Sequence, residues 1–413
     1  MDIEIKDIDP NNSKKGFGQK LAEFWNKFTY RIGEFFSNPK KRLIFIIVVG
    51  LVTIGAFGTG LYFLTGGRSQ TTTLSDNKKD EESIDKDKDL QEAPLDGLMV
   101  ARDAASRHPL GIIVENHTDA RPQAGLDKAS IVYEAIAEGG ITRFLAIFGT
   151  NEAEKVGPVR SARTYFVDWI HGYDGYFAHV GGNMDALDKI KSEKILDLDQ
   201  FSYSSPYHRE YKDGLATEHT MYTSTPELRT QAEKNGYSKA NNFNVLRFKD
   251  DQPAAENANS DDLADDGDSV ASTPADYKGD TQRVSINFSQ LSYNVYFEYD
   301  KKTNSYFRYL AGAPHKDQIS KNQINPKNVI VMTMGRTATI TRINEPGWSM
   351  DAVGSGKAMI YLDGREIEGS WKKTSASDRE IFYDKDGNEI TFNRGQFWIS
   401  VVHPDIKPIV TAE

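Results

Sequence analysis

Two arginines flank a serine in the stretch GPVRSAR at 157–163. The apolar pattern that follows predicts a helix, which would place Arg160, Ser161 and Arg163 in its first turn. Cations in that turn oppose the helix dipole, whereas free backbone N–H groups and guanidinium groups together suit a phosphate or a carboxylate. The stretch therefore predicts an anion-binding site, with ion pairing to nearby glutamates as the structural alternative.

The segment AHVGGN at 178–183 connects a predicted strand to a predicted helix. His179 ends the strand, and Gly181 belongs to the glycine pair that follows. Glycine lets the backbone approach a ligand, and such a loop would lie at the carboxyl edge of an open α/β sheet, where these folds bind ligands. A ligand-binding loop and a simple tight turn both fit this pattern.

Two carboxylates lie four residues apart, at Glu134 and Glu138, and are expected to share one face in a helix or a strand. Such a pair can act as general acid and base when the surroundings separate the two pKa values. Arg143 lies across a predicted hairpin and would instead neutralise one of them. Both interpretations stay open. The acid–base candidates are Glu134, Glu138, His179 and His219.

Polar side chains crowd the stretch ENHTDARPQ at 115–123, directly after a predicted buried strand. Polar residues in such a loop indicate either function or a turn rich in Asx residues. Five histidines lie between residues 117 and 219, but no pair has the spacing of a helical zinc motif, so we expect no metal and no cofactor. The ligand-binding candidates are Asn116, Arg121, Arg143, Arg160, Ser161, Arg163, His179 and Gly181.

The elements that must position these residues alternate in type between 98 and 248. We expect strands at 111–116, 131–138, 141–149 and 175–180, and helices at 160–172 and 184–192. The Gly139-Gly140 pair predicts a hairpin turn between the second and third strands, with a helix over 127–138 as the alternative. This order predicts an α+β or α/β domain.

A smaller, mainly β domain is expected at 281–410. This region holds many short aromatic and β-branched runs, and Asp363-Gly364 and Asp386-Gly387 are typical hairpin turns. A small barrel or sandwich is the expected form. An acidic, low-complexity insert at 249–280 separates the two domains. We expect it to be disordered, because its composition cannot bury enough apolar surface to fold.

An uncharged apolar run at 43–64 is long enough to cross a membrane as a helix. Basic residues precede it more densely than they follow it, so we predict a single pass with the N-terminus inside and the C-terminal domains outside. The cytoplasmic segment 1–42 carries an amphipathic pattern typical of a juxtamembrane helix. Residues 65–97 are expected to form a disordered linker.

Composition excludes several classes of protein. The 413 residues carry a formal net charge of −10, which disfavours a nucleic-acid binder. There is no cysteine, so disulfide bonds, thiolate catalysis and a cysteine-linked lipid anchor are excluded.

Long motifs in the chain resemble the bacterial YerB-like lipoprotein family, a two-domain family of unknown function. They are residues 115–148, GPVRSAR, HVGG (179–182), HRE (208–210), EHTMYTS (218–224), NVIVM (328–332), GSGKAMIYLDGREIEGSW (354–371) and FWISVVHP (397–404). The resemblance implies an extracytoplasmic protein and no established activity. The positions that carry the family motifs are Asn116, Arg121, Gln123, Glu134, Glu138, Gly139, Gly140, Arg143, Gly157, Arg160, Ser161, Arg163, His179 and His219. This chain departs from the family in lacking the lipidated cysteine.

Three functions are compatible with these observations. The first is a binding module on the cytoplasmic membrane that captures an anionic cell-envelope ligand, such as a cell-wall carboxylate or phosphate. The second is a cell-wall hydrolase that uses the glutamate and histidine candidates. The third is an envelope scaffold without a small ligand, whose partner proteins the sequence does not indicate.

Overall fold

The computed structural model describes residues 90–237, 243–250, 283–340, 344 and 346–411. All of them lie in one compact unit, Ile84–Glu413. The predictions for the cytoplasmic segment and the membrane span, most of the linker and nearly all of the acidic insert fall outside the described residues. For residues 90–97 the prediction of a disordered linker is wrong, because Leu90–Glu92 form a strand and Ala93 and Leu95 are buried. No helix among the described residues combines the length and apolar character needed to cross a membrane, and the span at 43–64 stays a prediction.

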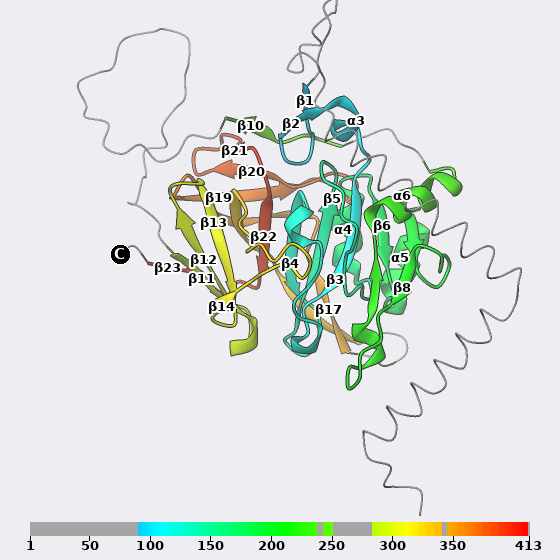
Figure 1. The fold of residues 1–413 in the computed structure, drawn as a ribbon. Coiled ribbons are helices and arrows are strands. Elements are labelled where there is room, and N and C mark those ends of the chain that lie inside the picture. The colour runs from blue at the N-terminus through cyan, green and yellow to red at the C-terminus, as the bar shows by residue number, and fades with distance from the viewer. Residues whose placement is uncertain (1–89, 238–242, 251–282, 341–343, 345, 412–413) are drawn as a thin grey trace, which may run out of the picture. The chain divides into compact units, whose positions relative to one another are not determined.

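A ten-stranded sheet forms the centre of this unit (Figure 1). Its strands, in spatial order, are β20 (Ile381–Asp384), β19 (Arg365–Lys373), β18 (Gly354–Leu362), β15 (Asn328–Thr333), β22 (Phe397–Val402), β4 (Ile131–Ile136), β5 (Thr142–Phe148), β3 (Leu110–Glu115), β6 (Tyr176–His179) and β7 (Leu196–Asp199). The central strands read as nearly continuous apolar runs because both faces of the sheet are covered.

The N-terminal and C-terminal halves of the chain share this sheet. Strand β22 pairs in parallel with β4, and it also pairs in parallel with β15. The prediction that the C-terminal half forms a separate small barrel or sandwich is therefore wrong. Five of its strands extend the sheet of the N-terminal half, namely β15, β18, β19, β20 and β22. Strands β3, β4, β6, β7, β15 and β22 all run in one direction, so their carboxyl ends meet at one edge.

A five-stranded sheet covers one face of the large sheet. It contains β14 (Ala313–Pro314), β13 (Ser305–Leu310), β12 (Asn294–Asp300), β11 (Arg283–Asn287) and β23 (Ile409–Thr411). Its inward side chains, such as Val284 and Phe297, pack with Phe144 and Trp398 of the large sheet in one apolar core. Four two-stranded ribbons complete the β structure: β1 (Leu90–Glu92) with β2 (Met99–Ala101), β8 (Tyr207–Arg209) with β9 (Met221–Thr223), β10 (Arg247–Lys249) with β21 (Thr391–Asn393), and β16 (Arg336–Ile340) with β17 (Pro346–Met350).

Helices contribute little of the described chain. They are α3 (Arg102–Ala105), α4 (Thr164–His171), α5 (Met184–Ser192) and α6 (Thr225–Lys234). Helix α4 packs its apolar side chains on the opposite face of the large sheet, in a second core that also holds Ile113 and Leu145. Asn183 caps α5 by accepting a hydrogen bond from the Ala186 N–H at 3.1 Å, which fixes where that helix begins.

Most predicted elements near the candidate residues are confirmed. Strands β3, β4, β5 and β6 and helix α5 form where expected, and Gly139 and Gly140 turn the β4–β5 hairpin with φ of +58° and +79°. The alternative helix over 127–138 is wrong, because Ile131–Ile136 is a buried strand. Helix α4 begins at Thr164, four residues after the predicted start at residue 160, because the preceding residues are extended.

Candidate functional site

The candidate residues gather at the carboxyl edge of the large sheet, where the segment 158–162 runs beside the end of β3. The Glu115 N–H donates to the Pro158 carbonyl oxygen at 2.9 Å, and the Arg160 N–H donates to that of Ile113 at 3.0 Å. These residues are held in an extended form by hydrogen bonds to the sheet. The placement of Arg160, Ser161 and Arg163 in a first helical turn is therefore wrong, and the helix-dipole argument does not apply to them.

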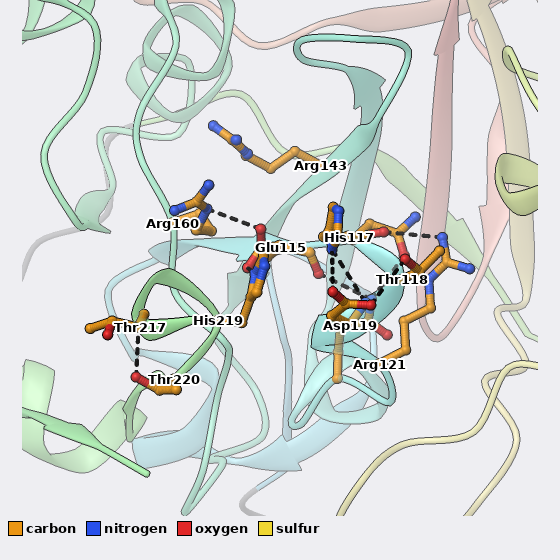
Figure 2. A network of polar contacts seen from close by, with 12 residues as sticks. Glu115, His117, Thr118, Asp119, Arg121, Arg143, Arg160, Thr217, His219 and Thr220 are labelled. Atoms are coloured by element: carbon orange, nitrogen blue, oxygen red, sulfur yellow. Dashed lines mark hydrogen bonds and ion pairs between the residues drawn. The ribbon is translucent and has the colours of Figure 1, made fainter. Parts of the chain in front are cut away.

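A buried carboxylate, Glu115, holds Arg160 and His219 together (Figure 2). Arg160 Nε lies 3.1 Å from one carboxylate oxygen, and His219 Nδ1 lies 2.8 Å from the other. The His219 ring stacks on His117, with ring centres 4.7 Å apart. Two of the five histidines between 117 and 219 thus meet in space, although they lie on separate loops. His219 reaches this position from the short 3-10 turn Thr217–His219.

A second acidic residue, Glu138, lies between two arginines. One of its oxygens accepts hydrogen bonds from Arg143 at 2.7 Å and from Arg163 at 2.8 Å. Burial raises the pKa of Glu138, but the two guanidinium groups outweigh burial and hold that pKa below its ordinary value. Arg143 also donates to the Ser161 carbonyl oxygen at 2.8 Å. The predicted neutralisation of a glutamate by Arg143 across the hairpin is confirmed for Glu138.

Glu134 belongs to a different environment, so the shared face expected for Glu134 and Glu138 is wrong. Glu134 is fully buried and accepts a hydrogen bond from the equally buried Arg308 at 2.7 Å. Trp398 donates to the same oxygen at 3.1 Å. Glu138 lies beyond the end of β4, in the turn, and its side chain binds the arginines at the sheet edge instead.

A closed ring of buried hydrogen bonds, here called the polar ring, joins Glu134 to the loop after β3. Arg308 donates to Glu134 and to His315. His315 contacts Gln123 at 2.9 Å, and Gln123 donates to Asn116 at 2.8 Å. Asn116 donates to Thr142 at 2.7 Å, and Thr142 donates to Glu134 at 2.9 Å. The members of the polar ring are Arg308, His315, Gln123, Asn116, Thr142 and Glu134.

Asn116 supports Arg121 in addition to closing the polar ring. Its side-chain oxygen accepts from Arg121 Nε at 3.1 Å, and its carbonyl oxygen accepts from Arg121 Nη2 at 3.0 Å. The guanidinium lies over the Tyr293 ring, 5.1 Å from its centre. Burial lowers the pKa of Arg121. Asn116 is fully buried, so it positions Arg121 and does not face solvent as a ligand-binding candidate would.

His179 and Gly181 form a self-contained loop. The buried His179 ring contacts Asp197 at 2.9 Å and the Gly181 carbonyl oxygen at 2.8 Å. The Gly181 N–H donates to the Asp199 carboxylate at 2.8 Å. A protein carboxylate therefore already occupies the donor that an anion would use. These contacts favour the tight-turn alternative for this loop, and His179 has no exposed surface.

Residues from the C-terminal half were missed by the sequence reasoning. Tyr293, Arg308 and His315 all contact residues of the candidate site or its supporting ring. One signal could have identified Arg308: it occupies an inward position of the alternating strand β13, between Tyr306 and Leu310, where a cation needs a buried partner.

Comparison with known proteins finds one matching family model in each half of the chain. The model for the N-terminal domain of a protein of unknown function (DUF3048) matches residues 95–238, and the model for its C-terminal domain matches 284–399. The chain belongs to this family.

Putative lipoprotein YerB of Bacillus subtilis (strain 168) is 33% identical over 318 residues, which cover 76% of this chain and 86% of that protein. The crystal structure of YerB from Bacillus subtilis matches with a TM-score of 0.63 at 30% identity, over 77% of this chain and 99% of that one. The resemblance inferred from the motifs is thus confirmed, and the family description assigns no activity.

Proposed function

We propose that this protein is a membrane-anchored binding protein that captures an anionic group, a carboxylate or a phosphate, at the Arg160 edge of the sheet. The observation that carries the proposal is the state of Arg160. Its Nε pairs with Glu115, and its two terminal nitrogens make no hydrogen bond to any of the described residues. A guanidinium with both terminal amino groups available offers the planar fork that carboxylates and phosphates accept.

The surrounding charges support the same proposal. Arg143 and Arg163 share the single carboxylate of Glu138. Within the described ranges no carboxylate makes a direct ion pair with Arg121, which Glu134 attracts only from a greater distance. Arginine charge at this edge therefore exceeds the carboxylate charge in direct ion pairs with it, with Glu218 as a further carboxylate that interacts with Arg160 through space. An added anion would offset this excess, and because the arginines are partly buried, salt would screen the attraction only in part.

The proposed location rests on two observations. The uncharged run at 43–64 has the length of a membrane-spanning helix, and basic residues lie mainly before it. The relative YerB bears the name of a putative lipoprotein, which is a membrane-anchored kind of protein. The ligand would accordingly be a component of the cell envelope, such as a cell-wall peptide carboxylate or a phosphate-bearing polymer.

Calorimetric titration of the full chain, purified in mild detergent, tests this proposal. The probes are purified peptidoglycan fragments and inorganic phosphate. Arg160→Ala should weaken binding by about 1–3 kcal/mol, or about 5- to 150-fold, because a charge-assisted hydrogen bond is lost.

Arg247→Ala is the matched control, because that arginine is exposed on β10 and pairs with Glu389 at 3.3 Å. It should leave affinity unchanged. Saturable binding that Arg160→Ala leaves intact in a folded protein refutes the arginine site. If no probe binds, the result favours the alternative of an envelope scaffold without a small ligand.

A cell-wall hydrolase is the second candidate, and one observation favours it. The hydrogen-bonded Glu115–His219 pair could orient His219 for acid–base work. The other acid–base candidates are less suited, since Glu134 and His179 are fully buried and the lowered pKa of Glu138 disfavours a proton donor. Release of soluble fragments from peptidoglycan that stops in His219→Asn would support this candidate over simple binding.

A further inference from the structure

Three potential metal ligands meet beside Glu115, and we propose that they bind a divalent transition-metal ion of the zinc class. His117 and Asp119 come from the loop after β3, and His219 comes from the turn before β9 (Figure 2). One ligand atom from each residue lies within 4.8 Å of the other two. Two imidazoles and one carboxylate form a donor set that zinc accepts readily.

Glu115 prepares His219 for this task. An ionised carboxylate can only accept, so the contact of 2.8 Å with Glu115 places the proton on His219 Nδ1. The Nε2 atom then carries a free lone pair. A carboxylate that orients a metal-binding histidine in this way is common in zinc sites and raises the basicity of the ligand. Glu115 also pairs with Arg160, so the negative charge of Glu115 offsets the positive charge of Arg160 close to the proposed ion.

The second histidine and the aspartate already have a geometry close to chelation. His117 Nδ1 lies 3.8 Å from one Asp119 carboxylate oxygen. The same nitrogen accepts a hydrogen bond from the Asp119 N–H at 3.3 Å, and a metal ion would replace this long bond. Two ligands on a tetrahedral zinc ion are about 3.3 Å apart, given metal–ligand distances of about 2.0–2.1 Å. The side chains of His117 and Asp119 are 32% and 63% exposed, so both can make the small adjustment. His219, at 8% exposed, is the fixed member.

Three protein ligands leave one position of a tetrahedral ion open. Structural zinc sites have four protein ligands, whereas three ligands and an exchangeable water are typical of sites that bind a further molecule. The open position would lie at the same edge as Arg160. Metal binding itself needs only these side chains, so this inference goes beyond the proposed capture of an anion and does not depend on it.

The test is a titration of the full chain with Zn²⁺ alone, in mild detergent and phosphate-free buffer. The protein carries no polyhistidine tag, is first stripped with a chelator, and competes with a chromophoric chelator for the ion. Excess Mg²⁺ occupies sites made only of carboxylates, such as any in the acidic segment 249–280. We expect one zinc ion per chain.

His117→Ala and Asp119→Asn should each lower zinc affinity by about 10-fold or more, and so should His219→Ala. The first two residues are exposed enough that circular dichroism should show an unchanged fold. Matched controls are His208→Ala and His403→Ala, since each of these histidines also lies beside a carboxylate, at 3.4 Å and 3.0 Å. The controls should bind zinc like the unaltered chain.

Two results overturn the inference. One is the absence of saturable binding at one ion per chain. The other is a zinc site whose affinity is the same in His117→Ala and Asp119→Asn as in the controls. Since no anionic ligand is present in this titration, failure here leaves the Arg160 proposal standing, and loss of anion binding in Arg160→Ala leaves the metal result standing.

Discussion

Replacing Arg308 by methionine should destabilise the protein strongly, and by an amount that depends on pH. Arg308 and Glu134 are both fully buried and lie 2.7 Å apart. Methionine fills much of the same volume but removes the cation, so a carboxylate remains inside the core without a counter-charge. Removing one partner of a buried ion pair typically costs about 3–5 kcal/mol.

A buried glutamate without a counter-charge can instead become neutral, and the free energy of this protonation sets the expected loss of stability. At pH 7 this step costs about 3.7 kcal/mol, because an ordinary glutamate has a pKa near 4.3 and each unit is worth 1.36 kcal/mol. At pH 5 the same step costs about 1 kcal/mol. The remaining hydrogen bonds from Thr142 and Trp398 soften the loss. We therefore expect Arg308→Met to cost about 3–4 kcal/mol at pH 7, and clearly less at pH 5.

Urea unfolding of the full chain in detergent, followed by tryptophan fluorescence, measures this difference. The Arg308 guanidinium lies 4.3 Å from the centre of the Trp398 ring, so the signal reports on the altered region. Arg283→Met is the matched control, because its exposed pair with Glu298 should contribute at most about 1 kcal/mol. Adding Glu134→Gln to Arg308→Met should recover stability at pH 7. A cost that stays the same at both pH values would refute the reasoning.

Two further predictions concern the two faces of the large sheet, His315 on the face that carries Arg308 and Gly111 on the face that α4 covers. Burial and the nearby Arg308 hold the pKa of His315 well below its ordinary 6.5. The unfolded chain therefore takes up a proton that the folded one does not, and the free energy of unfolding should fall below pH 6.5 by up to about 1.4 kcal/mol per pH unit. Urea unfolding should show a flatter slope in His315→Gln, and an unchanged slope would contradict the assignment. Gly111→Ala should cost about 1–3 kcal/mol, because its Cβ would lie 2.6 Å from Ile170 Cδ1. Thermal unfolding would show this, with partial recovery on adding Ile170→Val.

Local patterns predicted the elements of the N-terminal half well. Branched and aromatic side chains with a Gly-Gly turn define the β4–β5 hairpin, since both glycines need the positive φ that they adopt. The joining of β22 to β4 could not be predicted, because no local signal specifies which strands pair across most of a chain. The extended form of 158–162 was missed for the same reason: hydrogen bonds to the end of β3 override the helical pattern.

The candidate site was predicted in part. Polar residues crowded after a buried strand correctly indicated the loop that holds Asn116 and Arg121. The meeting of Glu115 and His219 was not predictable, because 104 residues separate them and no spacing rule connects two loops of this kind. The different environments of Glu134 and Glu138 depend on a partner, Arg308, that lies 174 residues beyond Glu134. Periodicity assigns a face to a side chain but does not identify what packs against it.

The polar ring has a consequence for how the two family regions can be inherited or recombined. Arg308 and His315 come from the region matched by the C-terminal model, and the other members come from the N-terminal one. Each hydrogen bond has one permitted direction, so every amide and the histidine must adopt a single orientation. A chimera that joins halves of two relatives would need both sets of partners to match. The two regions are modules in sequence only, and the loop bearing Arg121 is shaped by the half that it does not belong to.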